Sequence, residues 1–208
     1  MTLESNKNMG GIGAILMVLG VLPFLGAYSG IIAFIGLILV LIALKGMANH
    51  YNEAGIFDNA LYGIISTIIG VAVFIAVVIG AAAGLLTALG IHISNWSDWS
   101  ALQNFNWQGI TDMSVIWPYV TEILLALVAL FAFVVIATVF LRRSMNILSA
   151  KTGVHLFATT GILLLVGAIL TIIVIGVLLI WIALILLAIS FFRIRISPTL
   201  SVEPPRPA

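Results

Sequence analysis

Few side chains in this sequence could transfer protons or bind metal ions, and most of them lie in short polar segments. The chain has three histidines, seven acidic residues and no cysteine. His50 lies close to Glu53 and Asp58 in one polar segment, and His155 lies in another, so two imidazoles and a carboxylate could bind a metal ion. The histidines do not have the H-E-x-x-H spacing of a metalloprotease. Because such residues are common in polar connectors, we expect no metal and no cofactor.

Two ionisable residues, Glu122 and His155, remain as candidates for a functional role. Each lies about one helical turn inside an apolar segment, where ionisable groups often mark ion or proton pathways. The alternative is that water or a lipid headgroup simply solvates them near the membrane surface. The other polar groups inside the apolar segments are hydroxyls, which usually bond to carbonyls of their own helix. We therefore expect that the protein is not an enzyme.

The composition indicates that these residues belong to a protein whose surface faces lipid. Of the 208 residues, 63% are hydrophobic and 7% are charged, and the net charge is +1. Globular chains contain about 25% charged residues. The small net charge also argues against a nucleic-acid partner, so the expected partner is the lipid bilayer, with a membrane protein or a second copy as a further candidate.

The apolar segments predict six transmembrane helices. The run from Leu156 to Phe192 contains no ionisable residue, and it is long enough for two crossings of about 20 residues each. The other apolar segments are one crossing each. The predicted spans are 10–25, 29–44, 60–91, 119–141, 156–174 and 177–192, within a single domain of residues 1–196. The proline-rich segment 197–208 is predicted to be a disordered cytoplasmic tail.

The third apolar segment, residues 60–91, is longer than one crossing requires. It predicts a tilted helix, a protruding helix or two spans. We choose one helix, with Asp58 as its N-cap, because two spans would move Arg142, Arg143 and Lys151 to the outer side. The connectors on the basic side are predicted to be polar segments 46–57 and 144–153.

The 92–118 connector contains four of the five tryptophans. Trp96, Trp99 and Phe105 recur at three-residue multiples, which predicts a short helix in the plane of the headgroups. An aromatic anchor is the simpler interpretation, and a binding platform is the alternative. Asn95 begins an N-glycosylation triplet, which the predicted topology places on the outer side of the membrane.

Basic residues indicate which side of the membrane each end occupies. With six spans, all eight basic residues lie on the side of the two termini. Lys and Arg accumulate on the cytoplasmic side, so the sequence predicts a protein of the cell membrane with both termini in the cytoplasm. The eight are Lys7, Lys45, Arg142, Arg143, Lys151, Arg193, Arg195 and Arg206.

A weak internal repeat indicates three related helical hairpins that run in the same sense. A shift of 98 positions places Lys45-Gly46-Met47 on Arg143-Ser144-Met145, and a shift of 148 places Gly13 on Gly161. Each odd-numbered helix then begins with a glycine at the same position, Gly13, Gly63 or Gly161. Small residues let membrane helices approach closely, so these glycines are predicted to lie in helix contacts.

A second row of small residues runs along the third helix at intervals of four. It contains a GxxxG motif and predicts a helix-packing seam, either inside the bundle or against a second copy. The seam consists of Ala72, Ala76, Gly80, Gly84 and Ala88.

The opening Thr2-Leu3-Glu4-Ser5-x-Lys7-x-x-Gly10-Gly11-Ile12-Gly13, the two inner connectors and the closing apolar hairpin resemble a mostly archaeal family of polytopic membrane proteins classed as a domain of unknown function. The resemblance implies a membrane protein in a prokaryote, and it brings no functional residues with it. From the residues we expect a non-enzymatic scaffold, accessory or regulatory membrane protein. The alternative is a transporter or channel for a small solute, an ion or a lipid.

Overall fold

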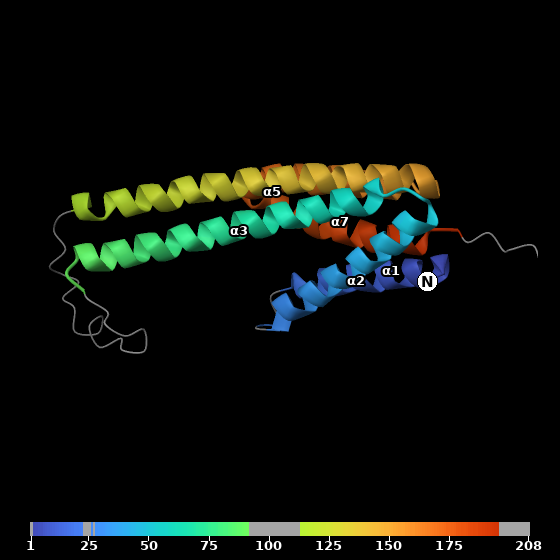
Figure 1. Cartoon of the computed structure of the whole chain (residues 1–208), viewed down its shortest axis with the longest axis horizontal. Helices are drawn as coiled ribbons and strands as arrows, with labels where there is room; N and C mark the ends of the chain where they lie inside the picture. The colour runs from blue at the N-terminus through green and yellow to red at the C-terminus, as the bar shows by residue number, and fades with distance from the viewer. Residues whose placement is uncertain (1, 23–25, 27, 92–112, 196–208) are drawn as a thin grey trace, which may run out of the picture. The chain divides into compact units, whose positions relative to one another are not determined.

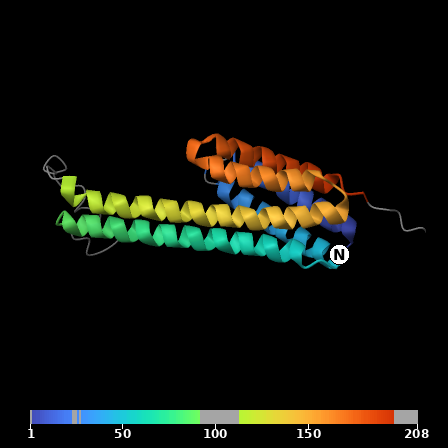
Figure 2. The same cartoon turned by 90° about the horizontal axis from the view of Figure 1, so that it is seen from above.

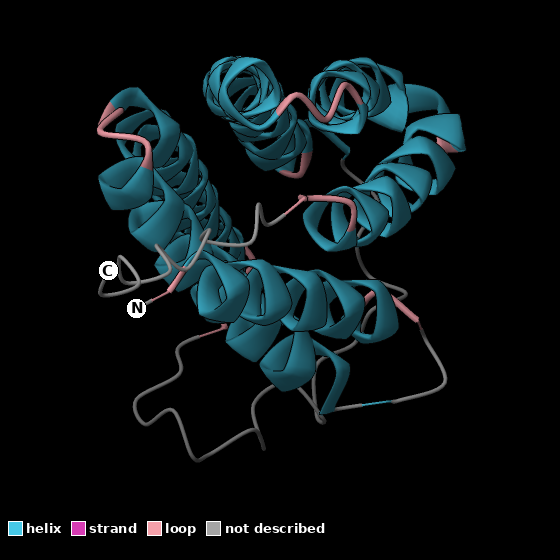
Figure 3. Cartoon of the chain, turned by 90° about the vertical axis from the view of Figure 1, so that its right-hand side faces the viewer, coloured by secondary structure: helices cyan, strands magenta, loops and turns pink. Residues whose placement is uncertain are grey.

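The described residues fold entirely into α-helices and connecting turns. The computed structural model describes residues 2–22, 26, 28–91 and 113–195, and no strand occurs in this part of the chain (Figure 3). Six α-helices confirm the predicted all-α class. They are α1 (Leu3–Gly20), α2 (Ser29–His50), α3 (Gly55–Ala88), α5 (Trp117–Thr152), α6 (Leu156–Leu170) and α7 (Ile175–Phe192).

Five of these helical segments are long and apolar enough to cross a membrane. Helix α1 is not among them, because its first turns carry Glu4, Lys7 and other polar residues. The count of six spans therefore remains a prediction.

The two connectors on the basic side are shorter than predicted, because helices α2 and α5 continue through most of them. Helix α2 extends to His50, and α5 extends to Thr152. Met47 in the first connector and Leu148 in the second are fully buried. Apolar residues at helical spacing keep one face of each helix packed against the core, and this is why the polar residues between them do not end the helix.

Helix α3 is one continuous helix of 34 residues, so the segment 60–91 does not divide into two spans. The helix begins at Gly55, and Asp58 lies in its first turn. Our prediction of Asp58 as the N-cap is therefore wrong, although a carboxylate in the first turn still favours the helix dipole. At 1.5 Å per residue α3 is about 51 Å long, which exceeds the hydrocarbon core of about 30 Å.

Three predictions concern residues outside the described part of the chain. They are the interfacial helix in the 92–118 connector, the glycosylation triplet at Asn95 and the disordered tail 197–208. Only the end of that connector is described, where Met113–Val115 form a 3₁₀ turn before α5.

The chain forms two compact units, Met1–Tyr62 with Thr138–Ala208 and Gly63–Ala137. The first unit holds α1, α2, α6 and α7 together with the beginning of α3 and the end of α5. The second unit is an antiparallel pair formed by the rest of α3 and α5, which lie side by side in both views (Figure 1, Figure 2).

Residues from all six helices form one hydrophobic core in the first unit. At its centre the rings of Phe157 and Phe191 meet edge to face, with centroids 5.2 Å apart. Hydrogen bonds also link elements that are distant in sequence. The Ser144 hydroxyl donates to the Ile56 carbonyl at 2.5 Å, and the Trp181 indole donates to the Val18 carbonyl at 3.3 Å.

In the second unit, side chains of α5 pack directly against small residues of α3. The backbone at Gly70 lies against the side chain of Phe133, and Gly84 lies beneath the ring of Tyr119. The Ser66 hydroxyl donates to the carbonyl of Phe133 at 3.2 Å. Small residues on α3 therefore make room for aromatic residues on α5.

Candidate functional site: a groove beside helix α2

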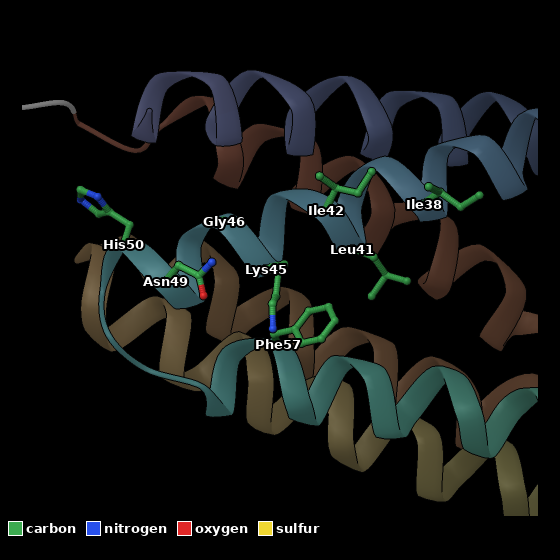
Figure 4. Close-up of a pocket in the computed structure, with 8 residues that line it drawn as sticks. All are labelled: Ile38, Leu41, Ile42, Lys45, Gly46, Asn49, His50 and Phe57. Atoms are coloured by element: carbon green, nitrogen blue, oxygen red, sulfur yellow. The ribbon is translucent and has the colours of Figure 1, made fainter. Parts of the chain in front are cut away.

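A groove of about 710 Å³ runs along α2 at the end of the first unit where basic residues gather (Figure 4). Small-molecule sites in proteins have volumes of roughly 300–1,000 Å³, so the groove is large enough for part of a ligand. Most of its lining comes from α2, and Phe57 on the first turn of α3 completes it. The lining residues are Ile38, Leu41, Ile42, Lys45, Gly46, Asn49, His50 and Phe57.

The groove changes from apolar to polar along the helix. Ile38, Leu41 and Ile42 form the apolar part, and Asn49 and His50 lie at the other end. The helical rise places Ile38 and Asn49 about 17 Å apart along the axis. An amphipathic groove of this kind fits a ligand with one polar end and one apolar end.

Lys45 lies between the two parts of the groove. Its ammonium nitrogen is 4.5 Å from the centroid of the Phe57 ring, and Figure 4 shows the two side chains pointing toward one another. A cation over an aromatic ring gains about 0.5–1 kcal/mol at an exposed site. The ring therefore holds the charge in place while leaving the donors of the ammonium group available.

Helix α2 contains no acidic residue, so the polar end of the groove places no negative charge beside Lys45 on that helix. Asn49 and His50 are exposed, and the His50 ring packs edge to face on Tyr51 at 5.0 Å. Burial raises the pKa of the Tyr51 hydroxyl above its ordinary value of 10.0, so Tyr51 is neutral at physiological pH.

Gly46 lies in the groove wall because of a contact on its other side. A Cβ atom at Gly46 would collide with the side-chain amide of Asn6. Asn6 is almost completely buried, and its amide nitrogen and oxygen have no hydrogen-bond partner among the described residues. The glycine at position 46 is therefore explained by the packing of α1 on α2, without any ligand.

The two polar residues singled out from the sequence lie outside this groove. Glu122 is exposed in the second turn of α5, in the second unit. His155 is exposed just before α6, in the first unit, and its side chain does not cap the helix. The structure gives neither residue a catalytic partner among the described residues, so their functional role stays a prediction.

The residues considered for metal binding are not gathered into a site. No group of three or more His, Asp or Glu side chains lies close enough to hold a metal ion in the described part of the chain. Glu53 instead pairs with Lys151 at 3.0 Å. This pair joins the turn before α3 to the end of α5.

The glycines near the start of the three predicted hairpins, in α1, α3 and α6, are all buried, and Gly13 and Gly161 pack against different helices. Gly13 packs against the backbone of α2 at Gly36, whereas Gly161 packs against α5 at Arg142. Gly63 is buried as well. Close packing at these positions was predicted, while the choice of neighbouring helix differs between them.

The row of small residues on α3 does not pack as one seam inside the second unit. Ala72, Ala76, Gly80 and Ala88 are exposed, and only Gly84 is partly covered. Four residues advance 400° around an α-helix, so a row spaced by four turns by about 40° at each step. Over sixteen residues the row moves to another face, and only Gly84 points at α5. A packing role for the exposed members remains a prediction, because none of the described residues of the second unit covers them.

The sequence contained one signal for the groove that we interpreted differently. The predicted second span, 29–44, places Lys45 directly after its end and assigns it no role beyond the charge of that side. A cation followed by a further turn of helix, together with an aromatic residue near the start of the next helix, could have indicated this corner.

Six α-helices, five of them long and apolar enough to cross a bilayer, indicate a multi-pass membrane protein. The chain belongs to the family described as "Protein of unknown function (DUF996)", which matches residues 32–185. The uncharacterized protein MJ1644 of Methanocaldococcus jannaschii is 29% identical over 194 residues, which cover 93% of this chain and 94% of the relative. No solved structure matches the chain.

These findings confirm the resemblance to a family of unknown function with an archaeal member. The opening residues Thr2 to Gly13 precede the matched region, so the value of that motif stays a prediction.

Proposed function

We propose that the protein is a six-span, non-enzymatic membrane scaffold or accessory subunit with both termini in the cytoplasm. The observation that supports this most is the backbone-to-backbone packing of its hairpins. A Cβ atom at Gly13 would lie 2.7 Å from the Gly36 carbonyl oxygen, and one at Gly176 would collide with the Gly167 carbonyl. Such contacts make rigid hairpins, which suit a protein that presents fixed surfaces to partners.

A contact between the two ends of the chain supports a shared side for the termini. The Lys7 ammonium group near the start of α1 donates to the Ile194 carbonyl after the end of α7, at 3.0 Å. Both residues belong to the first unit. The same unit contains Lys45, Arg143 and Lys151, so the positive-inside tendency assigns this end to the cytoplasm.

Equivalent contacts support a relation between the first two of the three proposed hairpins. The shifts of 98 and 148 positions make Gly46 equivalent to Ser144, and Asn6 and Ile56 equivalent to Val154. Asn6 packs against Gly46 in the first hairpin, and Ile56 accepts a hydrogen bond from Ser144 in the second. The same pair of positions therefore meets twice, at the same end of two hairpins.

A transporter or channel is the second candidate, and the groove is the observation that favours it. The groove extends only about 17 Å along α2, whereas the hydrocarbon core is about 30 Å thick. A site that reaches part of the way into the bilayer suits binding better than passage.

Single cysteines test the topology, because the native chain has none. A membrane-impermeant maleimide should label Met113→Cys in intact cells, and should label Ser5→Cys and Asn49→Cys only after permeabilisation. Labelling of Ser5→Cys but not of Asn49→Cys in intact cells would show that α1 does not cross and would refute the six-span proposal, and labelling of both would refute the cytoplasmic termini.

Reconstituted protein and a crosslinker test the function. Liposomes containing the protein should pass no ions, small solutes or lipids above the rate of empty liposomes. A photo-crosslinker at Gly80, whose added Cβ meets nothing within 4 Å, should capture a protein neighbour in native membranes. Flux through wild-type liposomes that disappears in Glu122→Gln would favour the transporter. Crosslinks from Gly80 to lipid alone would show that this face of α3 does not contact a protein partner.

A further inference from the structure

We propose that the groove beside α2 binds one membrane lipid with an anionic headgroup. The headgroup lies against Lys45 and Asn49, and the first part of one chain follows Leu41 and Ile38. The ligand class follows from the order of these residues along the helix, and the depth at which they lie rests on the proposed topology.

The groove runs from the membrane surface toward the hydrocarbon core. Lys45 directly follows the apolar part of α2, at the level where the proposed topology places the cytoplasmic headgroups. Ile42 lies one turn deeper and Ile38 two turns deeper, and their side chains are 39% and 41% exposed. A lipid presents its charge and its chain in this same order.

Charge selects the headgroup. No hydrogen bond or ion pair is made by the Lys45 ammonium group among the described residues, apart from its contact with the Phe57 ring. Of the nearby acids, Glu53 is occupied by Lys151, and Asp58 is exposed on the first turn of α3. A phosphate oxygen would form charge-assisted hydrogen bonds with the free ammonium donors.

The volume fits part of a lipid. About 710 Å³ is enough for a headgroup with the beginning of one chain, and the groove is open, so the rest of the lipid can remain in the bilayer. A free anion would leave the apolar wall formed by Ile38, Leu41 and Ile42 unused. A helix from a second copy would place apolar residues against Lys45 and leave its charge unpaired.

Binding to the purified full-length protein in detergent tests the proposal. Phosphatidylglycerol and phosphatidylcholine with identical chains are titrated and followed by native mass spectrometry. We expect phosphatidylglycerol to bind about tenfold more tightly, and Lys45→Gln to remove that preference. The matched control is Arg193→Gln, which removes an exposed charge at the end of α7 outside the groove and should keep the preference.

Other outcomes would overturn the proposal. Equal affinity for the two lipids, or equal losses in Lys45→Gln and Arg193→Gln, would show that the groove does not select an anionic headgroup. Displacement of the lipid by millimolar inorganic phosphate would indicate a free-anion site. The assay does not depend on sidedness, so its result is separate from that of the cysteine labelling.

A second measurement uses the unmodified protein and does not depend on the folding of a variant. Phosphatidylglycerol with a photoreactive group near the top of one chain should crosslink to α2 between Ile38 and Ile42. Crosslinks confined to other helices would refute the site.

A variant that fills the groove gives a third test. Leu41→Trp should fill the apolar part of the groove and weaken the binding of both lipids, and unchanged binding by a folded Leu41→Trp protein would also refute the site.

Discussion

The contact between Gly13 and Gly36 offers a test of how the hairpins are held together. We predict that Gly13→Ala destabilises the protein while Gly80→Ala does not. A Cβ atom at Gly13 would lie 2.7 Å from the Gly36 carbonyl oxygen and 2.9 Å from the Val40 nitrogen. Both are backbone atoms, so they cannot rotate away, and α1 and α2 would have to separate by several tenths of an ångström.

The size of the effect follows from comparing the two variants. Overpacking a close contact costs about 1–3 kcal/mol. Alanine also gains up to about 1 kcal/mol over glycine in a helix, and this gain is the same at both positions. A Cβ atom at Gly80 meets nothing within 4 Å. Gly13→Ala should therefore be about 1–3 kcal/mol less stable than Gly80→Ala.

Unfolding of both variants in mixed micelles, as the fraction of denaturing detergent rises, measures this difference. The wild-type protein and Gly26→Ala are the references, the latter because its glycine has a positive φ of 54° and nothing nearby. Because of this positive φ, Gly26→Ala should lose stability through backbone strain alone, without a steric clash. Equal stabilities for Gly13→Ala and Gly80→Ala would refute backbone packing between α1 and α2.

Three further substitutions probe the polar contacts of the first unit. Ser144→Ala should lower the free energy of unfolding by about 0.5–1.5 kcal/mol in the same assay, because it removes a buried hydrogen bond between α5 and α3; an unchanged value would argue against this bond. Lys151→Gln should cost less than about 1 kcal/mol, because the pair with Glu53 is about 40% exposed, and a loss that persists in 1 M salt would contradict this. Asn6→Leu should retain or increase stability, because its buried amide has no hydrogen-bond partner among the described residues; a large loss of stability would contradict this.

The sequence predicted the class of fold well because lipid imposes a simple rule on composition. Each span must satisfy its own backbone and present apolar side chains, so the run from Leu156 to Phe192 had to be helical. The ends of the helices were less predictable. The polar residues after Leu44 and Leu141 looked like connectors, but Met47 and Leu148 hold those turns in the core.

We did not predict the groove, because it depends on the pairing of two helices and the sequence offers only an indirect signal for that pairing. Lys45 and Phe57 lie on different helices with a turn between them, and sequence spacing does not determine that one covers the other. The row of small residues on α3 shows the opposite problem. A visible pattern from Ala72 to Ala88 turns around the helix by about 40° at each step, so it does not face throughout a neighbour that runs straight alongside.

Comparison of the proposed repeats explains why a site would form beside α2 in particular. Lys45, Arg143 and Arg193 are equivalent under the shifts of 98 and 148 positions. The Arg143 guanidinium lies 5.9 Å from the Phe140 ring on its own helix. Near Arg193, the Ile194 carbonyl is bound by Lys7.

At these two corners the polar contacts remain within α5 or between the ends of α1 and α7. At the third corner the aromatic partner of Lys45 belongs to the next helix, and an open groove lies beside the pair. If the three hairpins are related, the α2 corner is the one where the cation contacts a ring of the next helix and lies beside an open groove. Replacing Phe57 by Leu keeps the apolar wall and removes the ring, so it should weaken binding of the anionic lipid without changing the fold, whereas unchanged binding would mean that the ring does not orient Lys45.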